Sequence, residues 1–140
     1  MTSLITPNVR IKVSSVLQRD TVNFGKQNLT DGSNETCWNS EQGLPQYVLI
    51  DFGLVVLIQT ISLTFQGGFV GKKCVALGSL PESPNEYNIP IGTFYPEDIN
   101  STQKFDFESS TPVQRLKLIF EESSDFYGRI TIYNLDVFGQ

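Results

Sequence analysis

Residues 31–53 read DGSNETCWNSEQGLPQYVLIDFG and join a polar, turn-rich stretch to a predicted strand. The polar stretch carries Trp38, which is the only tryptophan of the 140-residue chain. From Tyr47 to Phe52 apolar residues predominate, as in a strand that is buried against a core. A polar loop that brings a large aromatic residue up to such a strand has three interpretations: a metal-binding loop, a platform for a ligand, or a corner of a β-sandwich core.

Strand patterns dominate on both sides of this stretch, and helix patterns are nearly absent. Residues 9–13 alternate between apolar and polar, and residues 58–65 are rich in β-branched side chains, as strands of a sheet require. Strands are predicted over residues 9–13, 47–52, 58–65, 73–77, 91–95, 103–107, 113–120 and 130–138. Short strands separated by turn signals predict an all-β fold, an eight-stranded antiparallel jelly-roll β-sandwich, in one domain over residues 1–140.

The tripeptide Asp51-Phe52-Gly53 is predicted to break the chain after the second of these strands. The strands on its two sides would then be neighbours in one sheet, or the chain would cross between two sheets at a corner.

Composition excludes several classes of function. Ten Lys and Arg residues against fifteen Asp and Glu give a net charge of −5, which disfavours direct binding of nucleic acid. No stretch approaches the about 20 apolar residues of a membrane-spanning helix, and the first residues lack the pattern of a secretory signal. We therefore expect a protein of the nucleus or cytoplasm that is not secreted and has no membrane partner. In that setting Cys37 and Cys74 are expected to be free thiols.

Catalytic chemistry is disfavoured by the residue types. The chain has no histidine, which is the commonest general acid or base and the usual partner of a nucleophile. The acidic groups Glu97-Asp98 and Glu121-Glu122 with Asp125 are expected to be solvated loop ends. We predict a binding protein that is not an enzyme and needs no cofactor.

The stretch from Asp31 to Thr36 offers several oxygen ligands in one tight turn, which suits Ca²⁺ in principle. It lacks the ligand spacing of an EF-hand loop. The competing interpretation is a turn in which Asp31 and Asn34 bond to the local backbone. Composition favours the turn, although the residues alone leave a metal site open.

Three segments together resemble the discoidin, or coagulation-factor C-type, domain: Asp31-Gly32 through Thr36 to Trp38, Tyr47 to Gly53, and Val137-Phe138-Gly139. The resemblance implies a galactose-binding-like β-sandwich whose binding face is formed by the loops at one end. Residues 37–43, 65–69, 94–98 and 124–129 are also similar to the family of small nuclear-receptor-associated proteins. Residues 38–52 resemble, in addition, the Doc subunit of the anaphase-promoting ubiquitin ligase.

This resemblance implies a non-catalytic intracellular module that binds an orphan nuclear receptor and represses its transcriptional activity. Two alternatives stay open: a structural subunit of a large assembly, such as a ubiquitin ligase or a ciliary complex, and a lectin-like carbohydrate-binding domain. Aromatic residues and Arg are typical of binding hot spots, although core packing is the competing role for the aromatic residues. The candidate partner-binding residues are Gln66, Phe69, Tyr95, Phe126, Tyr127 and Arg129.

The resemblance also bears on the metal. Many sugar-binding members of the superfamily hold Ca²⁺ with this loop and a carboxylate near the C-terminal strand. In this sequence Ser33 and Asn134 stand where carboxylates would be expected, and losing anionic ligands weakens Ca²⁺ binding. We predict that Asp31 and Thr36 keep the turn without a functional ion, and that Trp38 packs the turn against the core.

Overall fold

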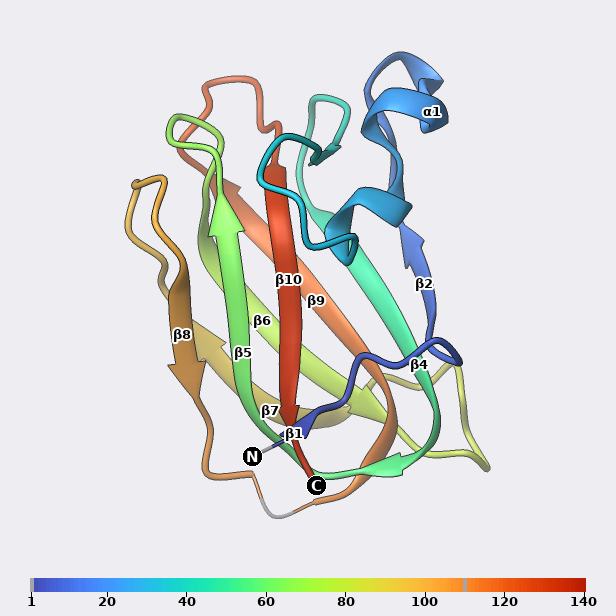
Figure 1. The fold of residues 1–140 in the computed structure, drawn as a ribbon. Coiled ribbons are helices and arrows are strands. Elements are labelled where there is room, and N and C mark those ends of the chain that lie inside the picture. Colours follow the sequence, from blue (N-terminus) through green and yellow to red (C-terminus); the bar gives the residue numbers. More distant parts are fainter. Residues whose placement is uncertain (1, 110) are drawn as a thin grey trace.

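In a computed structural model, which describes residues 2–109 and 111–140, two five-stranded antiparallel sheets pack face to face (Figure 1). One sheet has the order β1-β10-β5-β8, with β3 paired to β10, and the other has the order β2-β4-β9-β6-β7. The first sheet contains β1 (Thr2–Ser3), β3 (Trp38–Asn39), β5 (Ile58–Phe65), β8 (Gln103–Asp106) and β10 (Thr131–Gly139). The second contains β2 (Arg10–Val13), β4 (Gln46–Val56), β6 (Gly71–Ser79), β7 (Ile89–Phe94) and β9 (Val113–Ser123).

The predicted all-β sandwich is therefore confirmed, and each of the eight predicted strands corresponds to one of these ten. The two strands that were not predicted, β1 and β3, have two residues each. Such short segments carry no periodicity of their own. They become strands because both pair with the long strand β10.

The predicted break at Asp51-Phe52-Gly53 is wrong. Strand β4 continues through it to Val56, with a shift of register against β9 between Asp51 and Val56. Gly53 has a φ of +76°, which glycine adopts without steric cost, and the strand bulges there instead of ending. The chain turns at Leu57 and enters β5 in the opposite sheet, so the crossing between sheets is the arrangement found.

Between β2 and β3 the chain forms three short helical segments that the sequence did not reveal. They are η1 (Leu17–Arg19), α1 (Thr21–Phe24) and η2 (Lys26–Leu29). The Asp20 carboxylate caps α1 by accepting a hydrogen bond from the main-chain N–H of Asn23 at 3.1 Å, and Leu29 is fully buried in the core. Among the described residues no helix has the length and apolarity to cross a lipid bilayer.

The two termini lie at one end of the sandwich, where Thr2 pairs with Gly139. The loops of residues 40–45, 66–70, 95–102 and 124–130 lie at the opposite end (Figure 1). This second end is called the loop end below.

The core is organised around Trp38, whose side chain is completely buried. Its indole Nε1 donates a hydrogen bond to the Ser15 carbonyl at 2.9 Å. Its ring lies 6.2 Å from the ring of Phe120 on β9, and Phe65 on β5 meets Phe120 edge-on at 6.1 Å. The three rings thus connect both sheets with the segment that leads into the helices.

Replacing Trp38 with alanine should lower the free energy of unfolding by about 3–5 kcal/mol, because it leaves a large cavity in the core. Urea denaturation followed by circular dichroism measures the loss. The matched control is Phe126→Ala, which removes an aromatic ring that is 94% exposed and should change stability by no more than about 0.5 kcal/mol. A Trp38→Ala protein as stable as the control would contradict this account of the core.

Candidate functional site

The loop end is built from loops of both sheets, which are tied to one another by hydrogen bonds. The Val70 N–H donates to the Ser124 hydroxyl, and the Ser124 N–H donates to the Val70 carbonyl, both at 2.9 Å. The Gly43 N–H donates to the Tyr127 carbonyl at 2.8 Å. Three loops that are far apart in the sequence therefore form one connected surface.

Arg129 is the charged centre of this surface. Its Nε donates to Asp125 Oδ2 at 2.8 Å and its Nη2 donates to Asp125 Oδ1 at 3.1 Å. The Asp125 side chain is only 10% exposed. Hydrogen bonds from the guanidinium lower the pKa of the Asp125 carboxyl, and the same bonds raise the pKa of Arg129. Such a bidentate ion pair fixes the orientation of the guanidinium plane.

Two aromatic rings lie against the guanidinium group of Arg129. The guanidinium carbon of Arg129 lies 5.1 Å from the ring centroid of Phe69 and 5.6 Å from that of Tyr127. Tyr127 in turn meets Phe126 edge-on at 5.3 Å. Because cations are attracted to aromatic faces at these distances, Arg129 holds rings from two different loops in one cluster.

The turn of residues 125–128 makes this cluster possible. Gly128 has a φ of +79°, and a Cβ there would lie 2.9 Å from the Leu44 side chain and 3.2 Å from the Gly43 backbone. Only glycine combines this conformation with so close an approach. Its N–H donates to the Asp125 carbonyl at 3.1 Å, which closes the turn and brings Asp125 back toward Arg129.

The cluster leaves a large aromatic surface in solvent. Phe126 is 94% exposed and Tyr127 is 59% exposed, and Leu44 beside the turn is 43% exposed. Phe69 is half-buried beneath Arg129. Exposed aromatic residues held on a rigid support are the usual anchors of protein interfaces.

Of the six candidate residues, Phe69, Phe126, Tyr127 and Arg129 are brought together. Gln66 lies in the same turn as Phe69, and its carbonyl accepts the Phe69 N–H at 3.0 Å. Tyr95 is 66% exposed at the start of the 95–102 loop, but among the described residues no ring contact or hydrogen bond joins it to the other five.

The expectation that Asp125 is a solvated loop end is wrong, since its carboxylate is largely buried against Arg129. Asp98 is exposed, yet its carboxylate accepts the Gly68 N–H at 2.8 Å. The Asn100 side-chain carbonyl accepts the Gly67 N–H at 2.7 Å. Asp125 could have been suspected from its spacing of four residues to Arg129 with Gly128 between them, whereas Asp98 and Asn100 gave no such signal.

The stretch from Asp31 to Thr36 lies apart from this cluster and forms a turn held by its own side chains. Asp31 Oδ1 accepts the Ser33 N–H at 3.0 Å, and Asp31 Oδ2 accepts the Thr36 hydroxyl. The Asn134 side-chain N–H donates to Asn34 Oδ1 at 2.8 Å.

These donors do not fit a calcium site. Asp31 and Glu35 are the two carboxylates of the stretch, and both oxygens of Asp31 already accept hydrogen bonds. The Asn134 side chain is uncharged, and its hydrogen bond to Asn34 Oδ1 engages that oxygen as well. Among the described residues no three His, Cys, Asp or Glu side chains are gathered closely enough to hold a metal ion.

The two packed antiparallel sheets form a galactose-binding-like β-sandwich fold. A family model described as Sad1 / UNC-like C-terminal matches residues 8–140. A CBM32 module from Clostridium perfringens, solved in complex with GalNAc-beta-1,3-galactose, superposes with a TM-score of 0.81 at 21% identity, covering 99% of this chain and 100% of that one. An F5/8 type C domain from Bacteroides fragilis gives a TM-score of 0.83 at 13% identity, covering 99% and 96%. At these identities the likeness concerns the fold alone.

Relatives in sequence are more specific. Proteins named nuclear receptor 2C2-associated protein are 48% identical in Danio rerio, 48% in Xenopus laevis and 42% in Homo sapiens. Each alignment covers 99% of this chain, and they cover 96%, 99% and 96% of those proteins. The chain belongs to the family of the nuclear receptor 2C2-associated proteins, which confirms the resemblance to the small nuclear-receptor-associated proteins. The discoidin-type fold is also confirmed, and the resemblance to the Doc subunit stays a prediction.

Removing the Asp125 carboxylate should change how the free energy of unfolding depends on pH in acid solution. Because the folded-state pKa of Asp125 is lowered, its contribution is present above the ordinary carboxyl pKa of about 4 and is lost as the pH falls through the lower folded value. Asp125→Asn should therefore cost about 0.5–1 kcal/mol at neutral pH, and this difference should shrink toward zero as the solution is acidified. Thermal unfolding from neutral to acid pH measures it. The control Glu122→Gln removes an exposed carboxylate on β9 and should show no such convergence.

Calcium titration tests whether the turn of residues 31–36 binds Ca²⁺. Isothermal titration should detect no binding of Ca²⁺ at micromolar concentrations, and chelation should leave the melting temperature unchanged. A double variant, Ser33→Asp with Asn134→Asp, should gain measurable affinity, because added carboxylates strengthen Ca²⁺ sites. Micromolar binding to the unaltered chain would overturn the prediction.

Proposed function

We propose that this chain is a non-catalytic protein-interaction module of the nucleus or cytoplasm that binds a nuclear receptor and represses its transcriptional activity. The observation that carries the proposal is the aromatic surface of Phe126 and Tyr127, supported on the Arg129–Asp125 pair. The name of the relatives supplies the class of partner.

The chemistry of the loop end favours binding over catalysis. Arg129 already directs two of its donors to Asp125, so it is a support for the rings and not a free general acid. Burial raises the pKa of the Cys74 thiol far above its ordinary value, and burial also raises the pKa of Cys37. Since the thiolate is the reactive form of cysteine, neither residue is primed as a nucleophile.

The geometry of the surface suits a protein partner. The two exposed rings project from a turn whose backbone is held at the carbonyls of Asp125 and Tyr127, so little conformational freedom is lost when a partner covers them. A protein surface with an apolar pocket would remove both rings from water, and burial of aromatic side chains contributes strongly to affinity.

The experiment is a titration of purified nuclear receptor 2C2 with the purified chain, by isothermal calorimetry. The double variant Phe126→Ala with Tyr127→Ala should weaken binding by about 30-fold or more, as expected for a hot spot. The matched control is Leu54→Ala with Val55→Ala, which removes exposed apolar side chains, 60% and 47% accessible, from β4 near the opposite end. This control should bind normally.

Repression is tested separately with a reporter gene driven by the receptor. The unaltered chain and the β4 control should lower reporter output, and the Phe126/Tyr127 variant should not. Equal binding and equal repression by all three proteins would sink the proposed surface.

A lectin-like function is the second candidate, because the CBM32 module of the same fold was solved with a bound disaccharide. The same proteins can be heated with and without GalNAc-beta-1,3-galactose. The interaction proposal expects no shift in melting temperature, and a shift that disappears in the Phe126/Tyr127 variant would favour the lectin.

A further inference from the structure

The charges of this acidic chain are unevenly divided. Residues 1–30 carry four Lys and Arg residues and one acidic residue, Asp20, whereas residues 31–140 carry six Lys and Arg and fourteen Asp and Glu. The first part thus has a side-chain charge of +3 and the remainder has −8. The four basic residues of the first part are Arg10, Lys12, Arg19 and Lys26.

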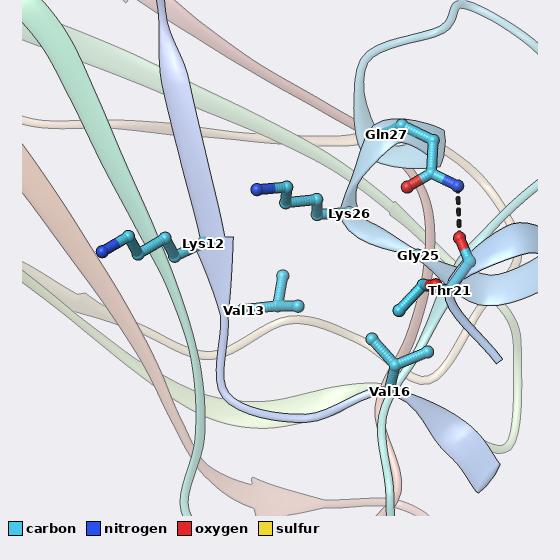
Figure 2. A pocket seen from close by; sticks show the side chains of 7 residues that line it. All are labelled: Lys12, Val13, Val16, Thr21, Gly25, Lys26 and Gln27. Carbon is cyan, nitrogen blue, oxygen red and sulfur yellow. Dashed lines mark hydrogen bonds between the residues drawn. The ribbon is translucent and has the colours of Figure 1, made fainter. Parts of the chain in front are cut away.

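Three of these residues, Arg10, Lys12 and Lys26, line two adjoining hollows between strand β2 and the helical segment. Figure 2 shows Lys12 and Lys26 at the first of these hollows. A hollow of about 270 Å³ has Lys12, Val13 and Val16 on the β2 side and Thr21 and Lys26 on the helical side. A second hollow of about 420 Å³ shares Lys12 and Lys26 and extends along β2 past Arg10 to Val9. Together the two hollows are called the β2 groove.

The basic side chains of the groove are available to a ligand. Within the described residues the ion pairs are formed by Lys73, Arg115 and Arg129, and by none of the four basic residues of the first part. No Asp or Glu lines either hollow. The nearby Asp20 carboxylate is engaged at the start of α1, where it accepts from both the main-chain N–H and the side-chain amide of Asn23.

Strand β2 also has a free edge among the described strands. It is the edge strand of its sheet and pairs with β4 alone. The Ser14 N–H donates to the Tyr47 carbonyl at 3.0 Å, and bonded and non-bonded pairs alternate along an antiparallel ladder. Arg10 and Lys12 are therefore in bonded pairs with β4, and the N–H and C=O groups of Ile11 and Val13 point toward the free edge.

We propose that the β2 groove binds an extended acidic peptide segment of a protein partner, which adds as a strand along β2. Its main chain would pair with Ile11 and Val13, and its carboxylates would lie against Lys12 and Lys26. Because side chains alternate along a strand, the residues between the carboxylates would face Val13 and Val16 and should be apolar. The site lies away from Phe126 and Tyr127 and does not depend on the function proposed for them.

Charge and main-chain pairing favour an acidic peptide over two other occupants of the groove, a second copy of the chain and a nucleic acid. A second copy of the chain paired through β2 would bring Arg10 and Lys12 of both copies together, and like charges placed opposite each other in a sheet destabilise it. A nucleic acid could also contact the cations of the groove, but it has no peptide main chain to pair with the free edge of β2. An acidic peptide can place carboxylates against Lys12 and Lys26, apolar side chains against Val13 and Val16, and its main chain along the strand edge.

The probe is a fluorescein-labelled peptide of alternating glutamate and valine, titrated with the full chain by fluorescence anisotropy. Saturable binding that weakens as salt is raised is expected, because exposed charges are screened. A peptide of alternating lysine and valine should not bind. The same glutamate–valine peptide with N-methyl groups at alternate residues should also fail, since it cannot donate hydrogen bonds to the strand edge.

Variants of the protein locate the site. Lys12→Glu with Lys26→Glu should weaken binding about tenfold or more, as expected when two attractive contacts become repulsive. The matched control, Lys72→Glu with Lys104→Glu, makes the same change of charge at two exposed positions of β6 and β8 and should retain affinity. Phe126→Ala should also retain it, which separates this site from the loop end.

Three results would overturn the proposal. The first is no binding of the glutamate–valine peptide, or equal binding of the lysine–valine or N-methylated peptide. The second is an equal loss in the Lys72/Lys104 control. The third is that a single-stranded oligonucleotide binds more tightly than the glutamate–valine peptide and that this binding is lost in the Lys12→Glu, Lys26→Glu variant. Circular dichroism of each variant establishes that it is folded, as expected for substitutions at exposed side chains.

Discussion

The burial of Trp38 is the constraint on which the rest of the structure depends. Its ring packs against Phe120 in one sheet, while its main chain pairs with Ile132 on β10 of the other. An indole N–H left without a partner in the core would cost about 1–3 kcal/mol, and here the Ser15 carbonyl accepts it. The ring can therefore be buried only where the segment after β2 reaches it. The polar turn before Trp38 is a structural corner that follows from this requirement.

A second buried side chain, Gln46 at the start of β4, connects the core to the loop end by hydrogen bonds. Its side chain is only 5% exposed, so each of its polar atoms needs a partner. It accepts hydrogen bonds from the hydroxyls of Ser14 and Ser15, and it donates to the carbonyls of Glu41 and Gly43. The Gly43 N–H then holds the Tyr127 carbonyl. The exposed aromatic rings of the loop end thus stand on backbone that is tied, through one glutamine, to the interior.

The sequence predicted those features that repeat along the chain and missed those that depend on contacts made in three dimensions. Strand β5 was predicted with its exact bounds because its β-branched run, residues 58–65, is buried almost throughout. The helical segment before Leu29 was missed because it is short and is held by the burial of that residue and by the cap at Asp20. In the candidate site, Phe126 and Arg129 were identifiable by residue type. The residue type of Asp125 did not show its role, which is indicated only by its spacing to Arg129 across the turn at Gly128.

The two surfaces use their cations in opposite ways, and this difference limits what each can recognise. At the loop end the charge of Arg129 is already matched by Asp125, so its effect is to orient rings. Affinity there must come mainly from apolar burial, which salt affects little. In the β2 groove Lys12 and Lys26 enter no ion pair within the described residues, so affinity there must include a term that salt screens. A single acidic chain can therefore present one aromatic and one basic surface, because it pairs the cation at the first and leaves the cations unpaired at the second.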